Sequence, residues 1–204
     1  SLFALASRHF YVNNYTCSAL VSIRHTIEMH IETGDSRFPR WTRGEVPRRD
    51  IPGAAGSNEE RDTGMKTMIR EVTAIPTLMH WRKEVIEHVF GVEPSKRLLV
   101  FTRRYYREHL ADGTHIAVVA EADGADAGCG AICLTDELPS PGNPSGRCAC
   151  LMNIYVREPY RRRGIGRLIV CWLIEKARGL GYDKIWLETS DGARALYEDV
   201  GFND

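Results

Sequence analysis

The sequence lacks several features, and each absence excludes a class of protein. Its 27 basic and 27 acidic side chains cancel, so the basic excess typical of nucleic-acid-binding proteins is missing. The longest unbroken apolar run, residues 168–174, is far shorter than the roughly 20 residues that cross a membrane. The first residues, SLFALASRHF, have no basic segment followed by an apolar one, so they do not predict a secretory signal.

Cysteine is also scarce, with six in 204 residues, too few for a disulfide-stabilised scaffold. Without an export signal we expect reduced thiols and a cytoplasmic location. Cys129, Cys133, Cys148 and Cys150 form two close pairs, but their spacing differs from the C-x2-C pairs common in zinc sites. Both pairs fall in strand-like segments, which predicts small buried residues and no metal.

The chain divides into two unequal parts. Residues 38–64 have no apolar periodicity, which predicts linker or disorder. Residues 19–32 alternate between apolar and polar and could form a strand, but no partner strand is nearby in the sequence and a lone strand is not stable. The sequence therefore predicts a disordered or poorly structured N-terminal extension over residues 1–64 and a domain over residues 65–204.

Residues 65–204 show a regular series of elements. Alternating and helical apolar spacing, with Pro and Gly at the ends of segments, sets their expected bounds. The expected order is a strand at 68–74, helices at 75–90 and 94–111, strands at 114–122, 127–135 and 147–156, a helix at 164–178, a strand at 184–188 and a helix at 191–200.

The run NIYVREPYRRRGIGRLIV, residues 153–170, carries the most chemistry. A strand ends, a basic turn follows and two glycines open a helix, whose first turn leaves unpaired N–H groups and a partial positive charge. Gly164 and Gly166 let the backbone approach a bulky anion, and Arg161, Arg162, Arg163 and Arg167 attract it. The run predicts a diphosphate site. It contains neither a Walker loop nor a complete GxGxxG dinucleotide fingerprint, and a plain helix start beside a solvated basic turn remains open.

Two motifs in this order resemble those of the GNAT acyltransferase family. Arg161, Gly164 and Gly166 match motif A, [Q/R]-x-x-G-x-[G/A] after a strand, and ARALYEDVGF resembles motif B, in which Tyr197 precedes Gly201 and Phe202. The resemblance covers residues 68–204. It implies an α/β fold with a mixed, mostly antiparallel sheet, splayed at the strand before motif A and flanked by helices. It also implies a further strand after Phe202, which this sequence lacks, so we expect the domain to be truncated at its C-terminus.

The same resemblance implies that acetyl-CoA is the co-substrate and that no metal takes part. The backbone of the splayed strand would bind pantetheine, and the basic turn would wrap the pyrophosphate. The implied cofactor-binding residues are Ile154, Tyr155, Val156, Arg161, Arg162, Arg163, Gly164, Ile165, Gly166 and Arg167.

The resemblance also implies catalytic roles. Tyr197 would donate a proton to the departing thiolate, although a core tyrosine packed beside Leu196 and Val200 is the alternative. Glu188 would act as base toward the acceptor amine through water, although a solvated surface glutamate is the alternative. Asn153 could face the same cleft, and a backbone N–H of Ile154 or Tyr155 would meet the oxyanion.

We therefore expect an N-acetyltransferase that acts by direct attack in a ternary complex. Its acceptor would be a small-molecule amine or a protein N-terminus, with no nucleic acid and no membrane as partner, and a homodimer is compatible with the fold. Glu84, Glu87 and His88 could hold a cationic amine or could form a solvated helix face. The alternatives are an inactive acyl-CoA-binding module of the same fold and, given the neutral net charge, a poorly supported nucleic-acid binder using Arg157 and Arg161–Arg163.

Overall fold

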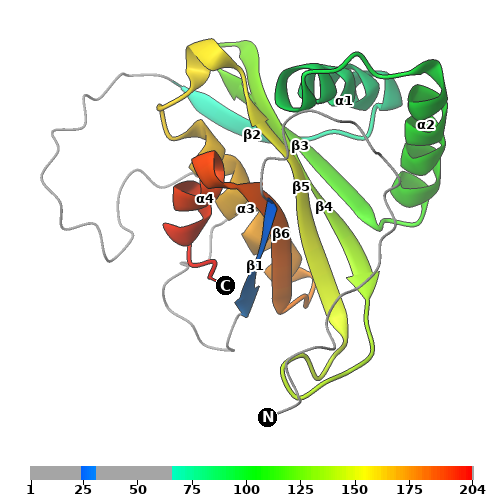
Figure 1. The fold of residues 1–204 in the computed structure, drawn as a ribbon, viewed down its shortest axis with the longest axis vertical. Helices are drawn as coiled ribbons and strands as arrows, with labels where there is room; N and C mark the ends of the chain where they lie inside the picture. Colours follow the sequence, from blue (N-terminus) through cyan, green and yellow to red (C-terminus); the bar gives the residue numbers. More distant parts are fainter. Residues whose placement is uncertain (1–23, 31–65, 204) are drawn as a thin grey trace, which may run out of the picture.

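The computed structural model describes residues 24–30 and 66–203, which form a six-stranded sheet with helices on both faces (Figure 1). The strands are β1 (Arg24–His30), β2 (Thr67–Glu71), β3 (His115–Ala122), β4 (Ala125–Asp136), β5 (Arg147–Val156) and β6 (Lys184–Ser190). The helices are α1 (Ile75–Phe90), α2 (Lys96–Ala111), α3 (Ile165–Gly179) and α4 (Asp191–Glu198), with a 3-10 turn, η1 (Glu158–Tyr160), between β5 and α3.

The sheet order is β1-β6-β5-β4-β3-β2, and every neighbouring pair is antiparallel except β5 and β6. The expected mixed, mostly antiparallel sheet is therefore confirmed. The expected elements are found within a few residues of their predicted bounds. Pro76 lies in the first turn of α1, and Gly91 ends that helix in the left-handed region at φ 66°, as their residue types predict.

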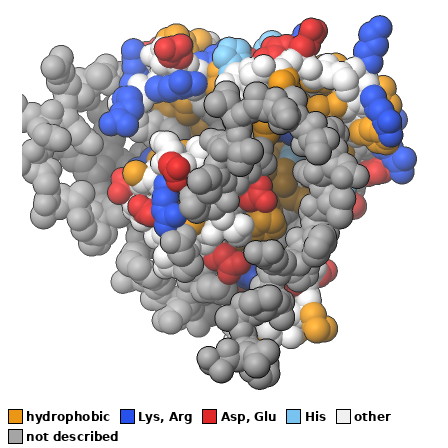
Figure 2. All heavy atoms as spheres, in the orientation of Figure 1, with side chains coloured by type: hydrophobic (Ala, Val, Ile, Leu, Met, Phe, Trp, Pro, Cys, Tyr) orange, Lys and Arg blue, Asp and Glu red, His pale blue; other side chains and the backbone are white. Residues whose placement is uncertain are grey.

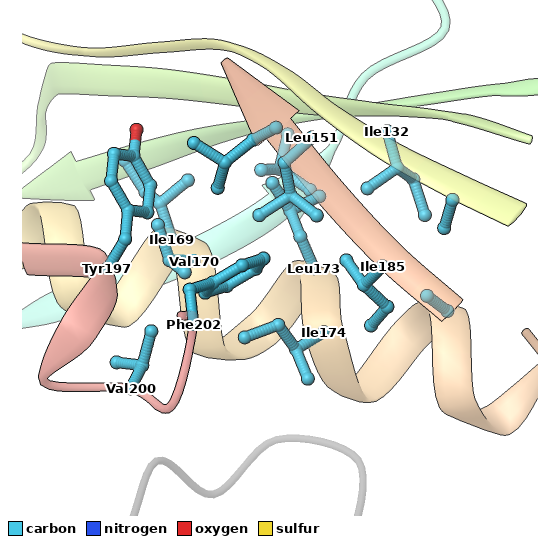
Figure 3. Packing of buried hydrophobic residues seen from close by; sticks show 14 of the residues in the cluster. Ile132, Leu151, Ile169, Val170, Leu173, Ile174, Ile185, Tyr197, Val200 and Phe202 are labelled. Carbon is cyan, nitrogen blue, oxygen red and sulfur yellow. The ribbon is translucent and has the colours of Figure 1, made fainter. Parts of the chain in front are cut away.

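Two apolar clusters hold the helices to the sheet. Strand alternation sends Ile132, Leu151 and Ile185 to one face, where they pack under α3 and α4. Figure 3 shows this cluster closing around Leu173 and Phe202. On the other face, residues of α1 and α2 pack against β3, β4 and β5 in a smaller cluster centred on the buried Trp81. Burial on both faces makes β4 and the first half of β5 the centre of the domain.

Strand β1 shows that part of the N-terminal extension belongs to the sheet. Residues 24–30 form the strand predicted within residues 19–32, and they pair antiparallel with β6 along its whole length. The partner was not evident from sequence because it lies far along the chain. Ile27 is fully buried, and Glu28 exchanges two backbone hydrogen bonds with Asn203, at 2.9 and 3.1 Å. The rest of residues 1–64 lie outside the described part of the chain.

Five cysteines lie in the described ranges, and all are free thiols. Cys129 and Cys148 are buried as expected, whereas Cys133, Cys150 and Cys171 are only half-buried. Residues 24–30 and 66–203 contain no group of three His, Cys, Asp or Glu side chains arranged to hold a metal ion. None of the described helices combines the length and the apolar character that crossing a membrane requires.

Candidate active site

The sheet opens between β5 and β6. These parallel strands pair at Cys148–Lys184, Ala149–Ile185 and Cys150–Trp186, and no pairing follows beyond Cys150. The remainder of β5, residues 151–156, is paired with β4 alone. One edge of this second half of β5, which we call the open half, therefore has main-chain groups directed away from β4 and toward the opening.

A bulge lies within the open half. Cys129 pairs with Tyr155 while Ala131 pairs with Met152, so that Asn153 and Ile154 together oppose Gly130. Asn153 has φ 58°, in the left-handed region that asparagine tolerates better than most residues. Its side-chain oxygen accepts a hydrogen bond from Arg82 Nη1 at 2.9 Å, so the amide is directed to α1. A bulge increases local twist and redirects the strand, which explains where β5 leaves β6.

Two glycines of β4 let the bulged strand approach. A Cβ on Gly128 would lie 2.7 Å from the carbonyl oxygen of Tyr155. A Cβ on Gly130 would lie 2.4 Å from Ile169 Cγ2 and 2.8 Å from Ile154 Cδ1. Both positions therefore need glycine so that β5 and α3 can pack against β4.

An ion pair holds the far end of the open half. Arg157 donates from Nε and Nη2 to the two carboxylate oxygens of Glu84 on α1, both at 2.7 Å, and from Nη1 to the carbonyl of Asp126 at 2.8 Å. Its guanidinium lies 4.4 Å from the ring centre of Trp81. The hydrogen bond from Arg157 lowers the pKa of Glu84. Glu84 is therefore neither a solvated side chain nor an available amine-binding group, and Arg157 is occupied.

The ladder fixes which backbone groups of β5 are available. The N–H of Arg157 donates to the carbonyl of Ala127 at 2.9 Å, so this pair is hydrogen-bonded, and pairing alternates along an antiparallel ladder. The backbone of Val156 consequently faces the opening, whereas that of Tyr155 is bonded to β4. The Tyr155 side chain is buried against Trp81. Of the three residues expected to bind pantetheine, Tyr155 has its main chain directed elsewhere.

The basic turn lies between the open half and α3. Arg161 donates from Nε to the carbonyl of Val156 at 2.9 Å, and Arg162 and Arg163 are exposed. Figure 2 shows basic side chains gathered over this side of the molecule, near η1 and α4 in the orientation of Figure 1. Arg167, on the first turn of α3, lies 3.9 Å from Asp199. The cations therefore surround the start of α3, and Arg161 also folds back over the open half.

The N-terminus of α3 has the properties of an anion site. Gly164 caps the helix at φ 79°, no side chain caps its first N–H groups, and its first turn has no acidic residue. Arg162 also has positive φ, at 60°. The two glycines serve different purposes. Gly164 has open space at its Cβ position and is required by its dihedral, whereas a Cβ on Gly166 would lie 3.3 Å from Leu196 Cδ2 of α4. Ile165 is buried and anchors the turn to the core.

Tyr197 lies at one end of the apolar cluster. Its ring meets Phe202 edge-on at 6.0 Å, and the N–H of Phe202 donates to the Tyr197 carbonyl at 3.1 Å after the chain turns at Gly201, φ 103°. Figure 3 shows its hydroxyl directed away from the labelled apolar side chains. Burial raises the pKa of Tyr197 to about 12, so the phenol keeps its proton at neutral pH.

Glu188 lies on the opposite face of the sheet. Ile185 and Leu187 face α3, so alternation places Trp186 and Glu188 on the face that carries α1 and α2. Glu188 is exposed and lies opposite Thr26 of β1. Its charge contributes, after burial and Cys133, to raising the pKa of the Cys150 thiol, which places it beside the last paired position of β5.

Comparison with known proteins assigns the arrangement to a family. The family model described as the acetyltransferase (GNAT) family matches residues 76–202. The chain belongs to the GNAT family. The domain resembles a predicted acetyltransferase from Clostridium acetobutylicum that was solved with acetyl-CoA, with 26% identity and a TM-score of 0.62 over 68% of this chain and 91% of that one. An aminoglycoside N-acetyltransferase solved with CoA is 17% identical, with a TM-score of 0.55 over 71% of this chain and 92% of that one, and supports the fold alone.

Curated relatives match a shorter part of the GNAT domain. Ribosomal protein bS18-alanine N-acetyltransferases from Salmonella typhimurium and Escherichia coli are each 41% identical over 59 residues. That segment is 28% of this chain and 40% of each relative, so it spans about two fifths of their length.

The residues present fit acetyl-CoA by three observations. The open half of β5 offers a strand edge, the start of α3 has uncapped N–H groups, and cations surround that helix start. The sequence indicated the strand, the anion turn and Tyr197. It missed the bulge at Asn153 and the Arg157–Glu84 pair, although glycines inside a strand, as in residues 128–130, are a signal of a bulge or a close backbone approach.

Proposed function

We propose that this protein is an N-acetyltransferase that transfers an acetyl group from acetyl-CoA to a primary amine by direct attack in a ternary complex. The observation that carries the proposal is the opening itself, where β5–β6 pairing ends at Cys150; two candidate side chains lie on opposite faces of the sheet. Tyr197 belongs to the core on the α3 face, and Glu188 lies on the face of α1 and α2. The two could act on one reaction only through the gap where β5 leaves β6.

The co-substrate, when bound, supplies an activated acetyl carbonyl and a thiolate leaving group. The Val156 carbonyl accepts from Arg161, so the Val156 N–H, with the backbone of Ile154, would hydrogen-bond to the pantetheine arm or to the acetyl oxygen. The uncapped N–H groups at Gly164–Gly166, with Arg161, Arg162, Arg163 and Arg167, would hold the diphosphate.

Tyr197 would donate its proton as the sulfur leaves. A thiol has an ordinary pKa of about 8.5, and burial raises the pKa of Tyr197 to about 12, so the phenol is protonated at neutral pH and can donate to the departing sulfur. Glu188, on the other face, would accept a proton through water from the acceptor's ammonium group, whose ordinary pKa is near 10.4, so that the neutral amine attacks the thioester.

The acceptor enters from the face of Glu188. The relatives from Salmonella and Escherichia coli act, by their names, on the alanine of a ribosomal protein, which favours a protein N-terminus over a small amine. The alternative is an acyl-CoA-binding module without turnover.

The test compares the wild type with Tyr197→Phe. Acetyl-CoA should raise the melting temperature of both, and free thiol should appear with peptides that begin with alanine. Tyr197→Phe should lower kcat by about 10²–10⁴-fold while the Kd for CoA stays within twofold. Binding without thiol release over a panel of amines and peptides would support the inactive module, and absence of CoA binding would refute both.

A further inference from the structure

A row of polar and sulfur side chains crosses the sheet on the face of α1 and α2. His115 of β3 pairs with Cys133 of β4, Cys133 pairs with Cys150 of β5, and Cys150 pairs with Trp186 of β6. Directly opposed residues share a face of the sheet. Cys133 and Cys150 are therefore neighbouring thiols on adjacent strands, and both are free.

The register places these two residues directly opposite each other on adjacent strands. The N–H of Glu137 donates to the carbonyl of Gly146 at 2.7 Å, and alternation from that pair makes Cys133 and Cys150 a hydrogen-bonded pair. Such pairs have Cα atoms about 5.5 Å apart, and disulfides prefer about 5.5–6 Å. The Cβ atoms of opposed residues lie about 4.5–5.5 Å apart, at the upper end in hydrogen-bonded pairs, whereas a disulfide holds them about 3.5–4.5 Å apart. Joining the two sulfurs therefore draws the strands together by about 1 Å, and the strained bond that results is easily reduced.

The surroundings distinguish this pair from the other described cysteines. Cys133 and Cys150 are both half-buried and directly opposed. Cys129 is buried and donates to the carbonyl of Asn153 at 3.4 Å, and Cys148 accepts from Asn143 Nδ2 at 3.5 Å. Cys171 belongs to α3, on the other side of the sheet.

Polar groups border the pair on both sides. Tyr105 of α2 lies beside Cys133, and its hydroxyl lies 3.2 Å from Nδ1 of the buried His115. Glu188 borders Cys150 on the other side, and burial, with the charges of Cys133 and Glu188, raises the pKa of Cys150 to about 12. Cys150 is therefore a poor nucleophile in free collision and is suited to an intramolecular step, where proximity compensates for a low thiolate fraction.

We propose that Cys133 and Cys150 are a reversible oxidation site, at which a low-molecular-weight disulfide such as oxidised glutathione joins β4 to β5. In the first step the Cys133 sulfur attacks one sulfur of glutathione disulfide, whose S–S bond breaks and releases one glutathione. In the second step the Cys150 sulfur displaces the other glutathione from Cys133. Two thiol hydrogens leave the protein, and the oxidant is reduced to two glutathione thiols.

The experiment treats the folded full-length chain with excess oxidised glutathione, followed by alkylation, tryptic digestion and mass spectrometry. Trypsin cuts after Arg107, Arg147 and Arg157, which separates Cys133 from Cys150. The expected product is the fragment 108–147 joined to the fragment 148–157, lighter by two hydrogens than the sum of the two reduced fragments. Dithiothreitol should restore the separate fragments.

Each fragment holds two cysteines, so variants assign the bond. Cys133→Ser and Cys150→Ser should abolish the joined fragments, whereas Cys148→Ser, a matched change two residues away on the same strand face, should keep them. Cys150→Ala serves as a second variant, and circular dichroism establishes that each one is folded. Joined fragments that persist in folded Cys150→Ser, or a stable glutathione adduct as the only wild-type product, would overturn the proposal. This outcome is independent of any acetyltransferase activity.

Discussion

The two halves of β5 are held in the sheet by different interactions. Residues 147–150 have β4 on one side and β6 on the other, so sheet hydrogen bonds secure them on both edges. The open half, residues 151–156, has β4 alone. Its other edge faces the opening, where the backbone of Val156 is directed.

The difference shows how one strand can serve both stability and binding. The open half has no second strand beside it. Two other features hold it in position: the close packing of its bulge against two glycines of β4, and the Arg157–Glu84 ion pair at its end. These devices act on the edge that faces β4 or on the side chains, so they leave the edge toward the opening available. The following variants remove them one at a time, in order of expected effect.

Gly128→Ala should have the largest effect. The new Cβ would lie 2.7 Å from the carbonyl oxygen of Tyr155, and because the obstacle is backbone, the open half must move away from β4. Overpacking of this kind costs about 1–3 kcal/mol, and we expect the upper end of that range in the free energy of unfolding, measured by urea denaturation. Acetyl-CoA affinity should fall as well, because the displaced strand lines the opening.

Gly142→Ala is the matched control. Its Cβ position has no atom within 4 Å, so the unfolding free energy should stay within about 0.5 kcal/mol of the wild type. A Gly128→Ala protein as stable as this control would show that the open half is not held closely against β4.

Glu84→Gln should have the next largest effect. It removes the charge from a half-buried pair with two hydrogen bonds at 2.7 Å, and charge-assisted bonds of this kind contribute about 1.5–3 kcal/mol. We expect a loss of about 2 kcal/mol at pH 7, measured by denaturation. The control Glu87→Gln removes a more exposed pair with Lys83 at 3.5 Å and should cost less than about 1 kcal/mol.

The difference in unfolding free energy between the wild type and Glu84→Gln should decrease at acidic pH. The pKa of Glu84 is lowered in the folded protein by its bond to Arg157, so its contribution is complete above the ordinary glutamate range and is lost as pH falls through the lowered value. The stability gap between the wild type and Glu84→Gln should therefore narrow below about pH 4.3. A gap that is constant down to pH 3 would contradict the ion pair as its cause.

The elements that depend on local sequence patterns were predicted better than the features that depend on residues distant in sequence. Alternation in residues 147–156 and helical spacing in α3 are local patterns, and both elements were found at nearly their expected bounds. The glycine-opened helix start was equally local. Glu188 and Tyr197 were singled out by resemblance to the GNAT motifs, because one glutamate and one tyrosine have no local signature.

The remaining features depend on partners distant in sequence. Arg157 and Glu84 lie 73 residues apart, and nothing near either residue indicates the pairing, so Glu84 was expected to be solvated or to bind an amine. β1 finds its partner β6 at the other end of the chain. Asn153 was expected to face the cleft, but its amide is directed to Arg82 because the bulge rotates it.

Gly164→Ala should have the smallest effect on stability and a clear effect on binding. Its φ of 79° is left-handed, and a side chain there costs about 1–2 kcal/mol, although its Cβ would touch nothing. We expect a loss of about 1 kcal/mol in unfolding free energy and weaker acetyl-CoA binding by calorimetry, because the strained cap shifts the N–H groups of the first turn of α3. Gly164→Asn should recover much of both, since asparagine tolerates this conformation. Equal losses for alanine and asparagine would show that the space at position 164, rather than its dihedral, is what binding requires.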